Sequence, residues 1–206
     1  ERTLHDQFTK NAKRYPFQKN IINEKGEGFN LFSTLVKGVI LSRIIREINP
    51  KSDYVGIMMP NVPATPAVFL GVLMADKIPA MLNYTAPTET FDKACELADL
   101  DVILTSKLFL AKLKRKPDER MICLEDFKGK VNWWMKTKWT LLCAATPRHL
   151  LIKMLSPLSY NDLERTGVVI YSSGSTGIPK GVMLTHRNLT SDVHAFFRVM
   201  GFRSGD

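Results

Sequence analysis

Between residues 53 and 124, short apolar segments alternate with amphipathic ones, and this alternation restricts the possible folds of the chain most strongly. The apolar segments predict strands at 54–59, 78–83, 102–105 and 121–124. Apolar side chains at spacings of three and four predict helices between them, at 63–76, 88–98 and 107–115. Strands and helices that alternate at this interval favour a mainly parallel sheet with helices on both faces, so the predicted fold class is α/β.

The residues before this region are predicted to add two helices and a hairpin. Residues 3–15 carry apolar side chains at helical spacing, and Pro16 ends that pattern. The turn at 24–28 lies between Ile21-Ile22 and Phe29, which indicates a hairpin, and a longer helix is predicted at 32–48. Thr88 or Thr90 is predicted to cap the helix at 88–98, because a threonine hydroxyl can accept a hydrogen bond from a free N–H group of the first turn.

A further strand is predicted at 167–171, and the segment Ser-Ser-Gly-Ser-Thr-Gly-Ile-Pro-Lys-Gly follows it at 172–181. Its glycines allow tight turns, its backbone N–H groups and hydroxyls supply donors, and its lysine supplies a compact cation, so the segment is suited to holding a polyphosphate. Lys180 is the predicted catalytic residue. The predicted phosphate-binding residues are Ser172, Ser173, Gly174, Ser175, Thr176, Gly177, Lys180 and Gly181.

Two better-known phosphate motifs do not fit this segment. The pattern G-x-x-x-x-G-K-[ST] fails because Pro179 precedes Lys180 and Gly181 follows it, and the dinucleotide pattern G-x-G-x-x-G fails as well. The alternative interpretation is a Ser- and Gly-rich surface loop that carries a lysine. A fixed order of ten residues directly after a strand favours the phosphate-binding interpretation.

The positive charge of the chain is concentrated in one region. Between Lys107 and Lys153, twelve Lys and Arg residues face four Asp and Glu residues, a difference of +8 within a total net charge of +9. Such a region can bind nucleic acid, an anionic membrane surface or an acidic protein, or it can be a solvated face without a partner. Nucleic acid is disfavoured, because no RNA-binding motif accompanies the basic residues.

A basic, tryptophan-rich segment at 128–159 is predicted to be an insertion or linker. Trp133, Trp134, Lys136, Lys138 and Trp139 would allow peripheral membrane contact, with the rings in the interface and the lysines near the headgroups. In the other interpretation the tryptophans pack on the domain while the lysines face water. The shortness of the amphipathic run and its interruption by Pro147 favour packing.

The cysteines and the lengths of the apolar runs limit the cellular compartment and the class of protein that we expect. Cys95, Cys123 and Cys143 are odd in number and widely spaced, so no protein-ligated metal site is predicted, and they are typical of buried thiols in a reducing compartment. No apolar run approaches the ~20 residues that span a bilayer. We therefore expect a cytoplasmic protein, with contact at the inner face of the cell membrane as the alternative. The chain opens at Glu1 without a signal segment and is expected to be part of something longer.

The segment at 172–181 resembles the signature loop of the adenylate-forming superfamily, which includes acyl-CoA synthetases. Residues 2–6, 55–65 and 78–86 resemble one branch of it, the acyl-acyl-carrier-protein synthetase part of bifunctional 2-acylglycerophosphoethanolamine acyltransferases. Thr176 departs from the glutamate expected in that branch and matches the wider superfamily. The resemblance implies that residues 1–206 form the N-terminal portion of an AMP-binding (adenylation) domain, with a sheet that is incomplete.

The resemblance also implies a two-step reaction with ATP and Mg²⁺. A fatty acid carboxylate would form acyl-AMP and pyrophosphate, and the thiol of acyl carrier protein or CoA would then take the acyl group, in the service of phospholipid acylation. The family elements that hold adenine and magnesium would follow Asp206, so turnover by these residues alone is predicted to be negligible. His186 is predicted to begin a helix that Thr185 caps. A non-catalytic basic module that binds an anionic membrane or nucleic acid is the alternative function.

Overall fold

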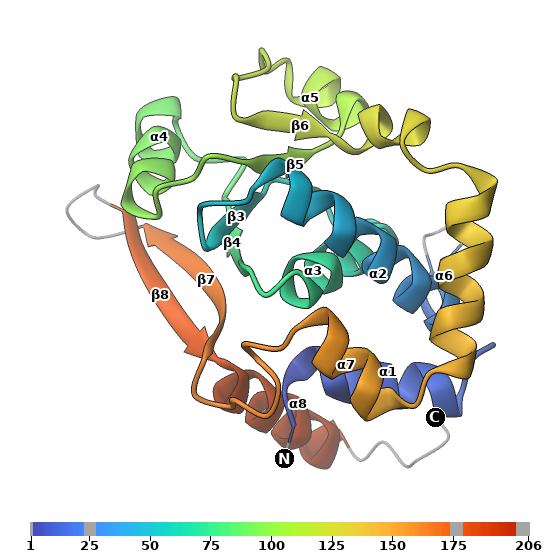
Figure 1. The fold of residues 1–206 in the computed structure, drawn as a ribbon. Coiled ribbons are helices and arrows are strands. Elements are labelled where there is room, and N and C mark those ends of the chain that lie inside the picture. Colours follow the sequence, from blue (N-terminus) through green and yellow to red (C-terminus); the bar gives the residue numbers. More distant parts are fainter. Residues whose placement is uncertain (1, 23–27, 174–178, 201–206) are drawn as a thin grey trace.

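The computed structural model describes residues 2–22, 28–173 and 179–200, and a six-stranded sheet lies at its centre (Figure 1). The strand order is β6-β5-β3-β4-β7-β8. The strands are β3 (Tyr54–Ile57), β4 (Ile78–Met81), β5 (Ile103–Thr105), β6 (Met121–Cys123), β7 (Thr166–Ser173) and β8 (Pro179–Thr185). Neighbouring strands from β6 to β7 pair in parallel, whereas β7 and β8 pair antiparallel, which confirms the predicted α/β class.

Helices cover both faces of this sheet (Figure 1). One hydrophobic cluster joins Val55, Ile57 and Leu104 to helices on one face, and a second joins Ala80 and Ile103 to helices on the other. Ile103 and Leu104 lie in different clusters because successive side chains of a strand point to opposite faces. The first face carries α1 (Leu4–Arg14), α2 (Leu31–Ile48) and α3 (Thr65–Met74), and the second carries α4 (Thr88–Leu97) and α5 (Lys107–Leu113).

The chain reverses its direction across the sheet after β4. It runs from β3 to β4 through α3, and then returns through α4 to β5 on the far side of β3. Since crossovers between parallel strands are right-handed, opposite directions of travel place α3 and α4 on opposite faces. The carboxyl ends of β3 and β4 therefore flank the point at which the strand order switches, where α/β proteins usually bind their ligands.

Helices α2 and α3 cross in close contact at a pair of glycines. A Cβ atom on Gly71 would lie 2.8 Å from Leu41 Cβ and 3.2 Å from the Gly38 carbonyl oxygen. A Cβ atom on Gly38 would lie 3.3 Å from Leu70 Cβ. The crossing therefore depends on the absence of a side chain at Gly71, and it holds α2 against the core.

The basic segment forms a 3₁₀ turn, η1 (Leu124–Gly129), and two helices, α6 (Trp133–Ala145) and α7 (Arg148–Leu155). Leu151, Ile152 and Leu155 of α7 are fully buried in the cluster that contains α2. The prediction that the tryptophans pack on the domain is confirmed only for half-buried Trp139 and is wrong for Trp133 and Trp134, whose exposed fractions are 60% and 66%. Their positions on the outer side of α6 explain the difference. Pro147 does not end the structured segment but precedes α7 as its N-cap residue.

Most predicted element ends lie within one or two residues of the observed ends, with two corrections of substance. Pro87 takes the N-cap position of α4, and no side-chain capping bond is formed there, so the predicted cap at Thr88 or Thr90 is wrong. Residues 179–185 form β8 instead of continuing the loop. The predicted hairpin near the N-terminus is confirmed by β1 (Lys19–Ile22) and β2 (Gly28–Asn30), which pair antiparallel. Within the described residues, every helix is too short or too polar to cross a bilayer.

Candidate functional site

The described ends of the predicted phosphate loop lie where β7 ends and β8 begins, at the tip of the β7–β8 hairpin. In the register of this pair, Ser172 lies opposite Lys180, Ser173 opposite Pro179, and Tyr171 opposite Gly181. The hairpin therefore brings Ser172, Lys180 and Gly181 together, as their predicted common role requires. The other predicted phosphate-binding residues, Gly174, Ser175, Thr176 and Gly177, lie outside the described residues, as does the side chain of Ser173.

Lys180 is exposed on β8 close to this tip, and among the described residues its ammonium group has no carboxylate partner. The Ser172 hydroxyl donates to the Lys180 carbonyl oxygen over 3.5 Å, which links the two strands just before the loop. A lysine without an ion pair keeps its full charge available for an anion. Its position beside the glycine-rich segment is therefore suited to contact with a phosphate group.

A cavity of about 280 Å³ adjoins the hairpin at the carboxyl end of β4. It lies between the segment that follows β4, the first turns of α4 and the tip of the hairpin. The strand order switches at this edge of the sheet, where α/β proteins usually bind their ligands. Asn83 stabilises the wall, since its side-chain oxygen accepts bonds from the Thr85 N–H (3.0 Å) and the Thr85 hydroxyl (2.7 Å). The lining residues are Leu82, Asn83, Thr85, Ala86, Pro87, Thr90, Phe91, Ala94, Tyr171, Ser172 and Pro179.

Tyr171 lines this cavity and carries a buried hydroxyl. Its hydroxyl is buried and has no hydrogen-bond partner within the described part of the chain, and burial raises the pKa of Tyr171 to about 12. A buried hydroxyl without a partner is energetically costly. This hydroxyl is inaccessible from the cavity and faces the interior on the side of Cys95 and Tyr54, so the ring, and not the hydroxyl, is what Tyr171 presents to the cavity. A Cβ atom on Gly181 would lie 3.2 Å from Val169 Cγ1 and 3.5 Å from the Tyr171 ring. The contact with Val169 is the tighter of the two, so a side chain at position 181 would require Val169 to shift.

The cavity residues Asn83, Thr85, Phe91 and Tyr171 were not predicted as site residues. A signal for them exists in the sequence, because Asn83 and Tyr171 end two predicted strands, and the carboxyl ends of parallel strands meet at one edge of the sheet. The sequence does not give the order of the strands in the sheet, and only the structure shows that β4 and β7 are neighbours.

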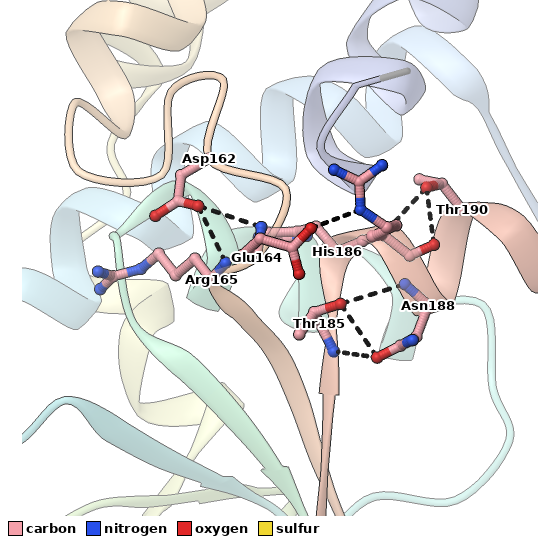
Figure 2. Close-up of polar contacts among 8 residues, drawn as sticks. Asp162, Glu164, Arg165, Thr185, His186, Asn188 and Thr190 are labelled. Atoms are coloured by element: carbon pink, nitrogen blue, oxygen red, sulfur yellow. Dashed lines mark hydrogen bonds and ion pairs between the residues drawn. The ribbon is translucent and has the colours of Figure 1, made fainter.

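Polar contacts fix the base of the hairpin where β8 passes into α8 (His186–Met200), as Figure 2 shows. The Thr185 hydroxyl accepts from the Asn188 N–H (3.2 Å), and the Asn188 side-chain oxygen accepts from the Thr185 N–H (2.9 Å). This reciprocal pair is a capping box, and it confirms the predicted cap at Thr185. Before β7, the Asp162 carboxylate accepts from the Glu164 and Arg165 N–H groups, both at 3.1 Å. Both ends of the hairpin are therefore held in place.

His186 begins α8 inside the core and not at the cavity. Its side chain is buried, and its Nδ1 accepts from the Leu4 N–H over 3.4 Å. Its ring packs edge-on against buried His5 with centroids 5.3 Å apart, and His5 Nε2 lies 3.0 Å from the Ser156 hydroxyl. Burial lowers the pKa of His186 to about 4 and that of His5 to about 3. The pair is neutral at pH 7 and joins α1, α7 and α8.

The described residues contain no group of three or more His, Cys, Asp or Glu side chains that could hold a metal ion. All three cysteines are buried, and burial raises the pKa of the Cys95 and Cys143 thiols to about 11. Such thiols are poor nucleophiles, because the reactive form is the thiolate. The chemistry available in the described part of the site consists of one lysine cation, hydroxyl donors and backbone groups.

The fold and this site define an α/β protein with a lysine-bearing hairpin beside a cavity. The chain belongs to the AMP-binding enzyme family, whose model matches residues 41–206. It is 31% identical over 149 residues to 4-coumarate–CoA ligase 4 of Arabidopsis thaliana, and 27% identical over 212 residues to a long-chain-fatty-acid–CoA ligase of Bacillus subtilis (strain 168). These alignments cover 68% and 93% of this chain but only 25% and 38% of the relatives.

Solved structures agree with this assignment at the level of the fold. The VinN complex with 3-methylaspartate superimposes with a TM-score of 0.75 at 19% identity, over 100% of this chain and 54% of that one. The fatty acid AMP ligase from Legionella pneumophila gives 0.73 at 18% identity, over 98% of this chain and 33% of that one. The match to the family model confirms the predicted superfamily, whereas the acyl-acyl-carrier-protein synthetase branch stays a prediction. The chain spans a part of the length of each of these proteins.

Proposed function

We propose that this chain is the N-terminal part of an ATP-dependent acid–thiol ligase that activates a fatty acid as its acyl-adenylate. The observation that carries the proposal is the position of Lys180, an unpaired cation within the described residues, next to Ser172 and Pro179 in the wall of the cavity. The residues 1–206 would then be one portion of an adenylation domain, with the segment 128–159 inserted in it.

In the proposed reaction, the groups of this chain stabilise negative charge. A carboxylate that attacks a triphosphate brings two anions together, and the Lys180 ammonium group would offset this repulsion and the charge that develops on the departing pyrophosphate. The Ser172 hydroxyl and the loop N–H groups would orient phosphate oxygens. Mg²⁺ would neutralise phosphate charge, and it prefers phosphate and carboxylate oxygens as ligands.

The identities of the acyl substrate and of the acceptor thiol are also proposals. The name of the Bacillus relative, long-chain-fatty-acid–CoA ligase, supports a fatty acid and CoA, and the 4-coumarate ligases support CoA with an aromatic acid. The resemblance of residues 55–65 and 78–86 supports acyl carrier protein as the acceptor, and with it a role in phospholipid acylation. Transfer of a labelled acyl group from the adenylate to CoA or to acyl carrier protein, measured side by side, would separate the two acceptors.

The first test is ATP–pyrophosphate exchange by the full-length protein with fatty acids as substrates. We expect exchange that depends on the fatty acid and falls by about 100-fold or more in Lys180→Ala, because electrostatic groups at a reacting phosphate commonly contribute this much. The matched control is Lys51→Ala, which removes an exposed lysine far along the chain and should leave exchange unchanged. Equal exchange by Lys180→Ala and the parent would contradict the role of Lys180, and no exchange with any carboxylate would contradict adenylation.

A further inference from the structure

The outward face of α6 is apolar, although this helix lies on the surface. Trp133 and Trp134 are largely exposed, their rings stack at 3.9 Å with an interplanar angle of 29°, and Leu141 is 64% exposed. With about 100° of rotation per residue, these side chains share one face with Thr137 and two exposed alanines. We call the residues Trp133, Trp134, Thr137, Leu141, Ala144 and Ala145 the outer face of α6. A helix that is apolar on its outer side normally has a partner there.

The opposite side of α6 is anchored, so the outer face cannot rotate into the core. Cys143 is fully buried, and Met135 and Trp139 pack on the cluster that contains α2. Arg43 of α2 lies over the Trp139 ring, 5.7 Å from its centroid. Lys13 of α1 donates to the carbonyl oxygens of Cys143 and Thr146, which fixes the C-terminal end of α6.

The sequence around the outer face of α6 contains positively charged residues and no negatively charged ones. Residues 127–161 contain no Asp or Glu, and they contain six cations: Lys128, Lys130, Lys136, Lys138, Arg148 and Lys153. Of these, Arg148 is paired with Asp6 of α1. Lys136 and Lys138 flank the outer face on its two sides, and both are exposed. In the described part of the chain, neither of them has a carboxylate partner. An anionic surface would be complementary to this arrangement.

We propose that α6 docks on the surface of an anionic lipid bilayer. Its tryptophans and Leu141 would enter the interface between headgroups and acyl chains, and its lysines would contact the lipid phosphates. Tryptophan is enriched at this depth of a membrane, and each nearby lysine adds electrostatic attraction. In Figure 1, α6 and the β7–β8 hairpin lie at opposite edges of the molecule, so docking through α6 leaves the cavity accessible. The proposal does not depend on adenylation.

The test is flotation of the full-length protein with vesicles, in the absence of ATP and fatty acid. The vesicles contain phosphatidylcholine alone or phosphatidylcholine with roughly 30% phosphatidylglycerol, so that the negative surface potential is the variable. We expect binding to the anionic vesicles that weakens at about 0.5 M salt. Trp133→Ala/Trp134→Ala should reduce the partition coefficient by about tenfold or more, and Lys136→Gln/Lys138→Gln by roughly tenfold.

Matched controls keep this test specific to α6. Leu97→Ala/Leu108→Ala removes two exposed apolar side chains on α4 and α5, and Lys51→Gln/Lys112→Gln removes two exposed lysines elsewhere; both should bind as the parent does. Circular dichroism checks that each variant is folded. The proposal is overturned if the parent binds neither vesicle, if the control variants lose as much binding as the α6 variants, or if Trp133→Ala/Trp134→Ala only converts a dimer to a monomer. Pyrophosphate exchange, measured on the same samples, reports the proposed function separately.

Discussion

At the scale of single residues, the buried pair His5 and His186 links folding to pH. Both rings are neutral in the native state, because burial lowers their pKa values from 6.5 to about 3 and about 4. His186 lowers the pKa of His5 further, whereas Arg165 lowers and Asp162 raises the pKa of His186. In the unfolded chain both would bind protons near pH 6.5. The stability that depends on neutral rings is therefore complete above pH 6.5 and is lost as the pH falls towards 4 and then 3.

We predict that the free energy of unfolding falls by about 4 kcal/mol between pH 7 and pH 5, since each histidine contributes about 1.4 kcal/mol per pH unit below its unfolded pKa of 6.5. Urea unfolding at the two pH values measures this difference. In His186→Gln the difference should be about half as large. His149→Gln/His194→Gln alters two exposed histidines and should leave it unchanged. A parent protein whose stability is the same at pH 7 and pH 5 would contradict the prediction.

Single residues also show how far the site could be predicted from the sequence. The motif at 172–181 was sufficient to predict a common site for Ser172, Lys180 and Gly181, because neighbouring residues in the chain form it, and their role in phosphate binding stays a prediction. Tyr171 and Asn83 could not be placed at one cavity in the same way, since their proximity depends on β4 and β7 being adjacent in the sheet. His186 was expected to be structural from its place at a helix start, but its contact with His5 crosses most of the chain.

At the scale of elements, local periodicity predicted the helices and the parallel strands, and it failed at β8. Pro179 and Gly181 are unfavourable inside strands, so residues 179–185 carry no strand pattern of their own. Pairing with β7 determines this strand, and its position at the edge of the sheet tolerates the proline. The exposure of Trp133 and Trp134 could not be predicted from the sequence either, because α6 is apolar on both sides and the sequence does not indicate which side faces α2.

The crossing of α2 and α3 gives a prediction at this scale. We expect Gly71→Ala to lower the free energy of unfolding by about 1–3 kcal/mol, because its Cβ would approach Leu41 Cβ to 2.8 Å and force the helices apart. This is opposite in sign to the effect of Gly→Ala on helix propensity, which favours Ala by about 1 kcal/mol. Gly129→Ala is the matched control, since a Cβ there meets no atom within 4 Å. Chemical denaturation compares the two, and equal stabilities would contradict close packing at the crossing.

At the scale of the whole molecule, the two edge strands of the sheet, β6 and β8, have different surroundings. β6 ends the sheet beside η1, whereas β8 ends it at a strand whose residues Lys180 to Met183 are all exposed. Ile170 and Val182 lie opposite each other in the β7–β8 pair, with exposed fractions of 45% and 47%. An apolar pair on an edge strand is a surface on which another chain, or another part of the same protein, can pack.

We therefore predict that residues 1–206, prepared alone, self-associate through β8 at concentrations of about 100 µM. Val182→Lys places a charge on the apolar pair and should shift the protein towards the monomer, because a charged residue on an edge strand opposes pairing with another edge. Sedimentation velocity measures the change. Leu108→Lys adds the same charge at an exposed apolar position of α5, which connects β5 to β6 at the other side of the sheet, and it should leave association unchanged. If both lysine variants reduce association equally, net charge and not the β8 edge controls it. If the unmodified chain is monomeric at this concentration, the β8 edge does not promote self-association, and its exposed apolar pair is compatible with a monomer in solution.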